Sequence, residues 1–189
     1  MLTAFGVDAT NLRKHMAHVR KQWREAAAAS VAAAARPADA EDMDEDAPKP
    51  PKPPLAVPEA FDRIVFNFPH RALGIKDQDH NVRANQELLA GFFRGALELL
   101  APGGEVRVTL KSGLPYSLWN APKLASQATK NALTLRTALP FDAAAFPGYA
   151  HRRTHGDGVS RPNAEELAGG ARTYCWRRAI EEPAAAKAS

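Results

Sequence analysis

Phe61-Asp62-Arg63-Ile64-Val65-Phe66-Asn67-Phe68-Pro69-His70 is the stretch of this sequence that decides the fold. Its centre, Ile64-Val65-Phe66, combines β-branched and aromatic side chains, which favour a strand. Pro69 has no backbone N–H and cannot continue a strand ladder. The pattern therefore predicts a buried parallel strand that ends in a rigid polar loop. Because ligands of open α/β sheets bind at the carboxyl ends of the strands, we expect a site in this loop.

The residues that follow predict a β-α-β unit. Apolar side chains recur every three or four residues between Asn81 and Leu100, which is typical of a helix with one buried face. Ala101-Pro102-Gly103-Gly104 is expected to stop this helix by a turn. Residues 105–110 then alternate in polarity and are rich in β-formers, which predicts a second strand beside the first.

The remainder of the compact region predicts one helix and two strands. The helix covers about 119–130, with Pro122 in its first turn, and the strands cover 133–139 and 172–178. The last strand has no helix before it, so we expect it to pair antiparallel with its neighbour. The sequence therefore predicts an α/β fold of parallel strands, one antiparallel last strand and helices on the faces.

Composition divides the chain into four parts. Residues 12–35 favour a helix with a long alanine tract. Residues 36–58 combine an acidic block with six prolines that follow it, as expected of a linker. The divisions that we predict are 1–19 as part of the folded domain, 20–58 as a low-complexity insertion, 59–180 as the main domain and 181–189 as a disordered tail.

Composition also excludes several classes of protein. Cys175 is the only cysteine, which rules out a disulfide framework within the chain and a multi-cysteine zinc site, and we expect it to be an inert core thiol. No apolar run approaches the ~20 residues of a membrane span, and we expect neither a membrane nor a metal as a partner. We expect the protein to be intracellular because it shows no secretory signal.

The charge distribution points to a polyanionic partner. The net charge is +4, although residues 39–46 hold six acidic side chains and no basic one. The rest of the chain is therefore strongly basic, which favours a nucleic acid as partner; improved solubility is the alternative explanation.

Four blocks together resemble a known family. They are 61–70, Asn85-Gln86-Glu87-Leu88-Leu89 with Phe92-Phe93, Pro102-Gly103-Gly104-Glu105-Val106 with 108–111, and Pro147-Gly148-Tyr149 with 151–154. The sequence is similar to the 25S-type ribosomal-RNA uridine-N3 methyltransferase-like family, which is Rossmann-type and uses S-adenosylmethionine. Gly6-Val7-Asp8 resembles the end of that family's third strand. The resemblance implies an incomplete Rossmann-like methyltransferase sheet without the glycine-rich cofactor loop of the family.

The resemblance implies roles for the loop that follows the first strand. The Asn67 amide would meet the imide edge of uracil, and Phe68 would stack on the extruded base or pack inward. Pro69 would stiffen the loop. His70 would act as a base, stack on the substrate or hold the loop backbone. Asp8 would meet the adenine amino group of the cofactor or cap the following helix.

The resemblance also implies contacts with RNA phosphate. Lys111 follows the second predicted strand, and His151-Arg152-Arg153 lies in a loop flanked by glycine and proline, where arginine forks can hold phosphate oxygens. The predicted activity is methylation of uridine N3 in large-subunit ribosomal RNA, in the nucleus or nucleolus, with the cytoplasm as the alternative location. Two alternatives remain open: a non-catalytic RNA- or pre-ribosome-binding module, and an amino methyltransferase that acts on DNA or protein.

Overall fold

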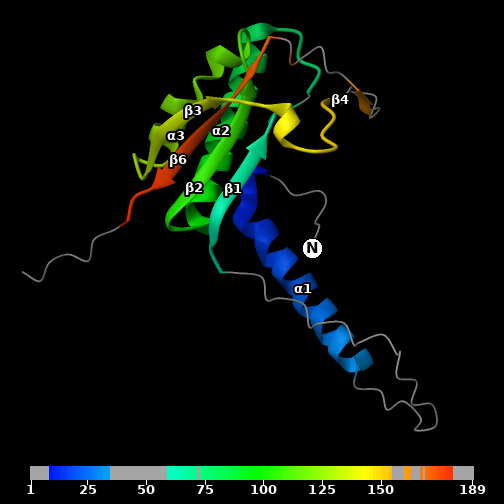
Figure 1. Cartoon of the computed structure of the whole chain (residues 1–189). Coiled ribbons are helices and arrows are strands. Elements are labelled where there is room, and N and C mark those ends of the chain that lie inside the picture. Colours follow the sequence, from blue (N-terminus) through cyan, green and yellow to red (C-terminus); the bar gives the residue numbers. More distant parts are fainter. Residues whose placement is uncertain are drawn as a thin grey trace, which may run out of the picture.

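A computed structural model of the chain describes residues 9–34, 59–71, 73–154, 160–162, 167 and 169–180. Within them, a four-stranded sheet and three α-helices form the main body (Figure 1). The helices are α1 (Leu12–Ala34), α2 (Gln78–Leu99) and α3 (Ala121–Ala128), with short 3-10 turns η1 (Ala9–Asn11), η2 (Tyr116–Trp119) and η3 (Ala143–Ala145). The strands are β1 (Phe61–Asn67), β2 (Leu100–Lys111), β3 (Leu133–Pro140), β4 (Arg152–Thr154), β5 (Ser160–Pro162) and β6 (Ala171–Arg178).

The strand order of the main sheet is β1-β2-β6-β3. β1 pairs parallel with β2 across the crossover helix α2, which confirms the predicted β-α-β unit. β6 pairs antiparallel with both β2 and β3, which confirms the expected direction of the last strand. β4 and β5 form a separate two-stranded hairpin, seen at the right of Figure 1. The fold is therefore α/β, as predicted.

The hydrophobic core lies between one face of the sheet and helices α2 and α3. Leu89 and Phe93 of α2 are fully buried against Val106 and Val108 of β2. The rings of Phe93 and Trp176 meet edge to face with their centroids 4.9 Å apart. Burying side chains of this size contributes about 1.5–3 kcal/mol each, so this layer accounts for much of the stability of the sheet.

The predicted helices and strands are observed with small shifts at their ends. α2 begins at Gln78 rather than at Asn81, because the Asp77 carboxylate accepts a hydrogen bond from the His80 amide at 2.8 Å and caps the helix. Pro122 lies in the first turn of α3, as predicted. The predicted turn at 101–104 is instead part of β2, which starts directly after α2, and Gly103 accommodates the tight path with φ +73°.

The prediction that residues 61–67 form a buried strand is wrong in one respect. β1 is parallel, but it is an edge strand whose only neighbour among the described residues is β2. Its burial alternates, and the side chain of Val65 is 50% exposed. An apolar strand sequence predicts burial on both faces only when helices cover both faces, whereas here α2 and α3 cover one.

The opposite side of the sheet, which we call the outer face, is polar. Because side chains alternate along strands, the residues opposite the core fall into three rows across β1, β2 and β6. The rows are Arg63-Glu105-Arg177, Val65-Arg107-Cys175 and Asn67-Thr109-Thr173. Cys175 is a buried free thiol in the middle row, so its predicted burial is confirmed, although it lies on the face opposite the core.

The N-terminal segment packs on α2 through two close approaches, one from η1 and one from the start of α1. An added Cβ on Gly91 would lie 2.9 Å from Thr10 Cβ, and one on Gly95 would lie 3.2 Å from Leu12 Cβ. From this contact α1 runs away from the sheet (Figure 1). The division predicted between residues 19 and 20 lies inside α1. The predicted linker 36–58 and the tail 181–189 lie outside the described residues.

We expect Gly91→Ala to destabilise the protein, although alanine is the better helix former. The new methyl group overlaps Thr10, including its Cα at 3.1 Å, and relief of such overpacking costs about 1–3 kcal/mol. The helix-propensity gain of about 1 kcal/mol offsets only part of this cost. Urea unfolding measures the net change. Gly169→Ala, in a turn, is the control because no described residue lies within 4 Å of its added Cβ. Equal stability of the two variants would contradict the packing of residues 9–12 on α2.

Candidate functional site

The carboxyl ends of β1 and β2 lie side by side and form the base of the site. The Phe68 amide donates to the Thr109 carbonyl at 2.8 Å, which carries the parallel pairing one residue beyond β1. Phe68 then adopts φ +50°, and Pro69 is buried directly after it. A left-handed conformation at a non-glycine residue costs on the order of 1 kcal/mol, so the surrounding contacts must hold this turn.

A chain of three polar side chains crosses the sheet at this level. The Thr109 hydroxyl donates to Asn67 Oδ1 at 2.8 Å, and the Thr109 and Thr173 hydroxyl oxygens are 2.9 Å apart. Asn67 is exposed, whereas Thr109 is only 1% exposed. The predicted substrate contact, Asn67, is therefore fixed from behind by a buried hydroxyl while its side chain faces solvent.

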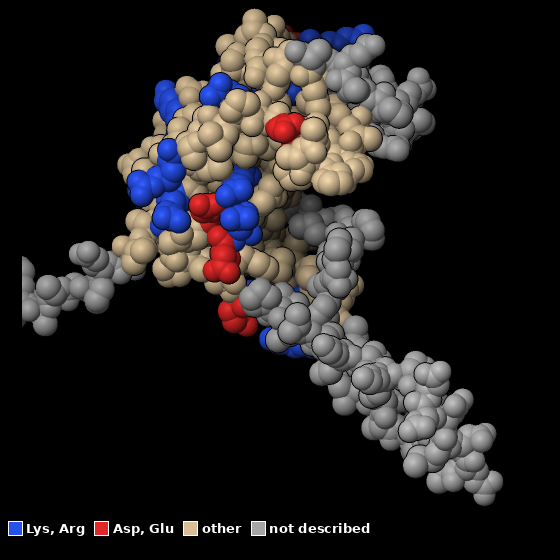
Figure 2. Space-filling model, in the orientation of Figure 1, with Lys and Arg blue, Asp and Glu red and all other residues tan. Residues whose placement is uncertain are grey.

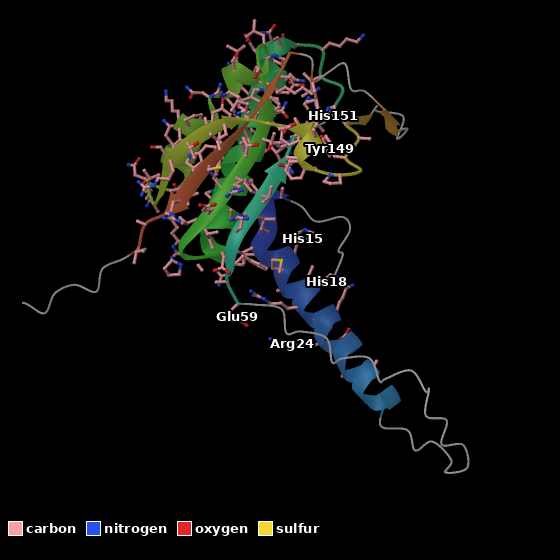
Figure 3. The ribbon with its side chains drawn as sticks, in the orientation of Figure 1. His15, His18, Arg24, Glu59, Tyr149 and His151 are labelled. Carbon is pink, nitrogen blue, oxygen red and sulfur yellow. The ribbon has the colours of Figure 1, made fainter. Side chains whose placement is uncertain are left out.

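Five aromatic side chains gather beside this turn and form what we call the aromatic cluster: Phe68, Phe141, Phe146, Tyr149 and His151. The Phe68 ring meets the Phe141 ring at 5.2 Å and the His151 ring at 4.7 Å between centroids, both edge to face. Phe146 stacks on Phe141 at 5.6 Å with an interplanar angle of 15°. Figure 3 shows His151 and Tyr149 together near the end of β1. These ring contacts hold Phe68 in its left-handed turn.

His151 does not have the surroundings expected of a phosphate-binding side chain. Its side chain is buried, and burial together with the positive charge of Lys111 lowers the pKa of the imidazole. The Tyr149 hydroxyl lies 2.9 Å from His151 Nδ1, and burial raises the pKa of that phenol. A neutral imidazole paired with a protonated phenol is suited to packing and hydrogen bonding rather than to holding an anion.

The loop after Pro69 is tied to α2. The Arg71 amide donates to Asn85 Oδ1 at 2.9 Å, and Asn85 Nδ2 donates to the Asn81 carbonyl at 2.9 Å. Asn85 is 1% exposed. His70 is exposed, and its ring centroid lies 6.1 Å from that of Trp119 at the end of η2. His70 is thus placed on the α2 side of the turn, in contact with solvent.

A shallow pocket of about 170 Å³ opens at the end of β2. Its lining includes Lys111, Arg172, Tyr116 and Tyr174. Lys111 Nζ lies 5.5 Å from the centre of the Tyr116 ring, and Arg172 donates to the Ala138 carbonyl at 2.7 Å. The pocket therefore combines cations with aromatic faces, a combination that suits an anionic or aromatic ligand.

Three predicted site residues have no described side chain. Arg152 and Arg153 belong to the backbone of β4, but their side chains lie outside the described part. Asp8 lies outside the described residues altogether. Their predicted roles stay predictions.

Sequence reasoning missed five of the residues described above: Thr109, Thr173, Phe141, Phe146 and Tyr149. Thr109 and Thr173 could have been found from the strand pattern, because they are polar positions at the same distance from the ends of two predicted strands. The spacing of the aromatic residues carries no periodic signal, since they lie in irregular backbone between β3 and β4.

Two further observations concern metal-binding groups and membrane-spanning helices. Across the described ranges, no group of three or more histidine, cysteine or acidic side chains could hold a metal ion. None of the helices in the same ranges is long and apolar enough to cross a membrane.

The lowered pKa of His151 predicts a pH-dependent stability. An imidazole whose pKa is lower in the folded state than its ordinary value of 6.5 is protonated more readily in the unfolded chain. The stability that the folded protein gains from keeping this imidazole neutral is therefore complete above pH 6.5, and it is lost as the pH falls below that value. We expect the melting temperature to fall between pH 8 and pH 5.5, and to fall less in His151→Phe. The Glu105 carboxyl does not account for a change in this pH range, because its pKa is lowered from the ordinary value of 4.5 and it therefore affects stability only at lower pH. An equal fall in both proteins would show that His151 is not buried as described.

Comparison with known proteins gives one family and several partial relatives. The chain is 34% identical to the Saccharomyces cerevisiae protein "25S rRNA (uridine(2634)-N(3))-methyltransferase" over 54% of this chain and 39% of the relative. It is 39% identical to the Arabidopsis thaliana "Heavy metal-associated isoprenylated plant protein 41" over 54% of this chain and 19% of the relative. The chain thus spans less than half the length of either relative.

Among solved structures, the TrmN structure from Thermus thermophilus is 26% identical, with a TM-score of 0.33 over 63% of this chain and 24% of that chain. The NodS N-methyltransferase from Bradyrhizobium japonicum with S-adenosyl-L-homocysteine is 12% identical, with a TM-score of 0.34 over 66% of this chain and 49% of that chain. TM-scores this low carry no argument about the site. The family described as "rRNA (uridine-N3-)-methyltransferase BTM5-like" matches residues 1–153, and the chain therefore belongs to this BMT5-like family.

Proposed function

We propose that this chain serves the methylation of uridine N3 in ribosomal RNA, and that its described residues hold the target uridine. The observation that carries the proposal is the exposed Asn67 amide, fixed by Thr109 at the end of β1 beside the aromatic cluster. Family membership supplies the reaction class, and the printed name of the yeast relative supplies the substrate class.

Asn67 and the adjoining rings match two properties of uracil. The imide edge of uracil places N3–H between two carbonyl groups, and a carboxamide can hydrogen-bond such an edge with one side chain. The base is planar, so it stacks on aromatic rings, with about 1–3 kcal/mol for each stacked base. Phe146, which is 53% exposed, and Tyr149, which is 37% exposed, offer such surface within the aromatic cluster. A uridine turned out of its RNA stack would therefore have both an edge contact and a stacking surface here.

His70 and Lys111 keep their predicted roles within this proposal. His70 is exposed beside the turn, where an imidazole could accept the N3 proton or stack on a base. Lys111 lies over the Tyr116 ring at the mouth of the shallow pocket, where it would meet a phosphate of the bound RNA. Pro69 is buried and limits the movement of the turn.

The outer face of the sheet supports RNA as the partner. Glu105 forms ion pairs with Arg107 at 2.8 Å, Arg63 at 3.7 Å and Arg177 at 3.8 Å. The hydrogen bond from Arg107 and the three nearby guanidinium groups lower the pKa of the Glu105 carboxyl. One carboxylate cannot neutralise three guanidinium groups, so the outer face keeps a positive charge in the two rows next to the Asn67 row. Figure 2 shows Lys and Arg gathered on this side of the molecule. RNA phosphates bind to such surfaces.

The methyl donor implied by the family is S-adenosylmethionine, and the pocket at the end of β2 does not fit it. The cofactor carries a positively charged sulfonium and ammonium group, whereas the pocket at the end of β2 is lined by Lys111 and Arg172. No carboxylate is among the residues that line that pocket to meet the ribose hydroxyls. The proposed cofactor contact, Asp8, lies outside the described residues.

An alternative proposal is a non-catalytic RNA- or pre-ribosome-binding module. The same basic outer face and aromatic cluster would serve it, and the misfit between the pocket and the cofactor favours it. Both proposals place the protein with ribosomal RNA, for which we expect the nucleus or nucleolus.

Asn67→Ala tests the proposed function. We expect the unchanged chain, given S-adenosylmethionine and a uridine-containing ribosomal RNA segment, to form 3-methyluridine, which mass spectrometry of the digested RNA measures. Removing the amide should lower product formation by at least about 100-fold and change RNA affinity less than about threefold, because the phosphate contacts remain. Val65→Ala, an exposed change on the same strand, is the control. RNA binding without any product, together with no heat of S-adenosylmethionine binding in calorimetry, would favour the alternative.

Reversing two charges tests the predicted phosphate contacts of β4. We expect Arg152→Glu with Arg153→Glu to weaken RNA binding and to lower the slope of log affinity against log salt by about 1.5, since each lost phosphate contact removes about 0.7–0.9. Arg13→Glu with Arg24→Glu on exposed α1 is the matched control, because it makes the same change in net charge away from the sheet. If both double variants show the same salt slope, Arg152 and Arg153 affect RNA binding only through the net charge of the protein.

A further inference from the structure

The direction of the hydrogen bonds in the row Asn67-Thr109-Thr173 follows from their chemistry. A carboxamide oxygen can only accept, so Thr109 must donate its single hydroxyl hydrogen to Asn67 Oδ1, 2.8 Å away. Thr109 Oγ then has only acceptor capacity left. Thr173, whose hydroxyl oxygen is 2.9 Å from it, must therefore be the donor of the second bond. The two bonds run in one direction, from β6 through β2 to β1.

This direction decides which face of the amide meets a ligand. Thr109 is 1% exposed and its hydroxyl sits behind Asn67 in the sheet. In this structure the Oδ1 branch of Asn67 is the one that faces Thr109, and the threonine side chain is stiff about χ1, so the accepting atom of this contact stays in place. The group on the free branch of the exposed Asn67 side chain is the NH₂ group, a donor.

We propose that Thr109 is a positioning residue that fixes Asn67 as a hydrogen-bond donor, so that the site accepts the carbonyl edge of uridine and rejects the amino edge of cytidine. The inference rests on the proposed function and names its specificity. Uracil and cytosine differ at position 4, where uracil carries a carbonyl and cytosine an amino group. If the Asn67 NH₂ group faces the amino group of cytosine, two donors meet and neither has an acceptor. A site built to hydrogen-bond one group of its substrate discriminates strongly against a base that lacks that group.

Substitutions at Thr109 test the inference by binding and spectroscopy, without depending on turnover. Thr109→Val keeps the shape and removes the hydroxyl, Thr109→Ser keeps the hydroxyl, and Thr137→Val on exposed β3 is the matched control. Fluorescence titration with hexauridylate and hexacytidylate measures selectivity. We expect the native chain to prefer hexauridylate by about tenfold or more, Thr109→Val to lose most of this preference, and Thr109→Ser and Thr137→Val to keep it.

Nuclear magnetic resonance of the Asn67 side-chain amide, assigned by its absence in Asn67→Ala, reads the positioning directly. We expect Thr109→Val to shift this signal and Thr109→Ser to leave it near its native position. If Thr109→Val does not fold in a thermal melt, Thr173→Val takes its place, with a smaller shift and a partial loss of selectivity expected.

The outcomes separate the two claims. An unmoved amide signal with unchanged selectivity in Thr109→Val would overturn the positioning role, and a preference for hexacytidylate in the native chain would overturn the donor direction. A shifted amide signal in a chain that forms no 3-methyluridine and does not prefer hexauridylate would uphold the positioning of Asn67 but refute the proposed function and the specificity built on it.

Discussion

The parallel register of β1 on β2 is the constraint on which the site depends. It sets Asn67 opposite Thr109, and the Phe68 amide on the Thr109 carbonyl carries the same register into the turn. A slip of one residue would turn every β1 side chain to the opposite face of the sheet and would bury Asn67 against α2. The polar row, the left-handed turn and the aromatic cluster around Phe68 all follow from this one pairing.

The sheet has two unlike faces because, in the part of the chain that the structure describes, helices cover only one of them. Side chains that face α2 and α3 form a dry core of large apolar residues, whereas the outer face carries arginines, Glu105 and the threonine row. The polar row would be costly inside an apolar core unless every group were paired. At the margin of the outer face, the same groups can be paired on one side and open to a ligand on the other. This arrangement explains how one strand both stabilises the fold and presents a functional amide.

The strands and helices were predictable because their signals are local. The apolar periodicity of α2, the proline in the first turn of α3 and the β-rich run of β6 each depend on neighbours in the sequence. The edge position of β1 was not predictable, because the number of strands beside it is a property of the whole sheet. The burial of His151 was missed for a related reason: its sequence neighbours are arginines, but its contacts are Phe68 and Tyr149.

By itself, the sequence determined the α/β order of elements, the family resemblance and the polar turn at 67–70. Tertiary structure alone decided that Asn67 presents its amide nitrogen, that His151 is buried with a lowered pKa, and that the arginines of three strands share one face. The physical reason is that each of these properties arises between residues far apart in the chain. Thr109 acts on Asn67 from 42 positions away, and no local pattern records which of the two amide atoms it holds.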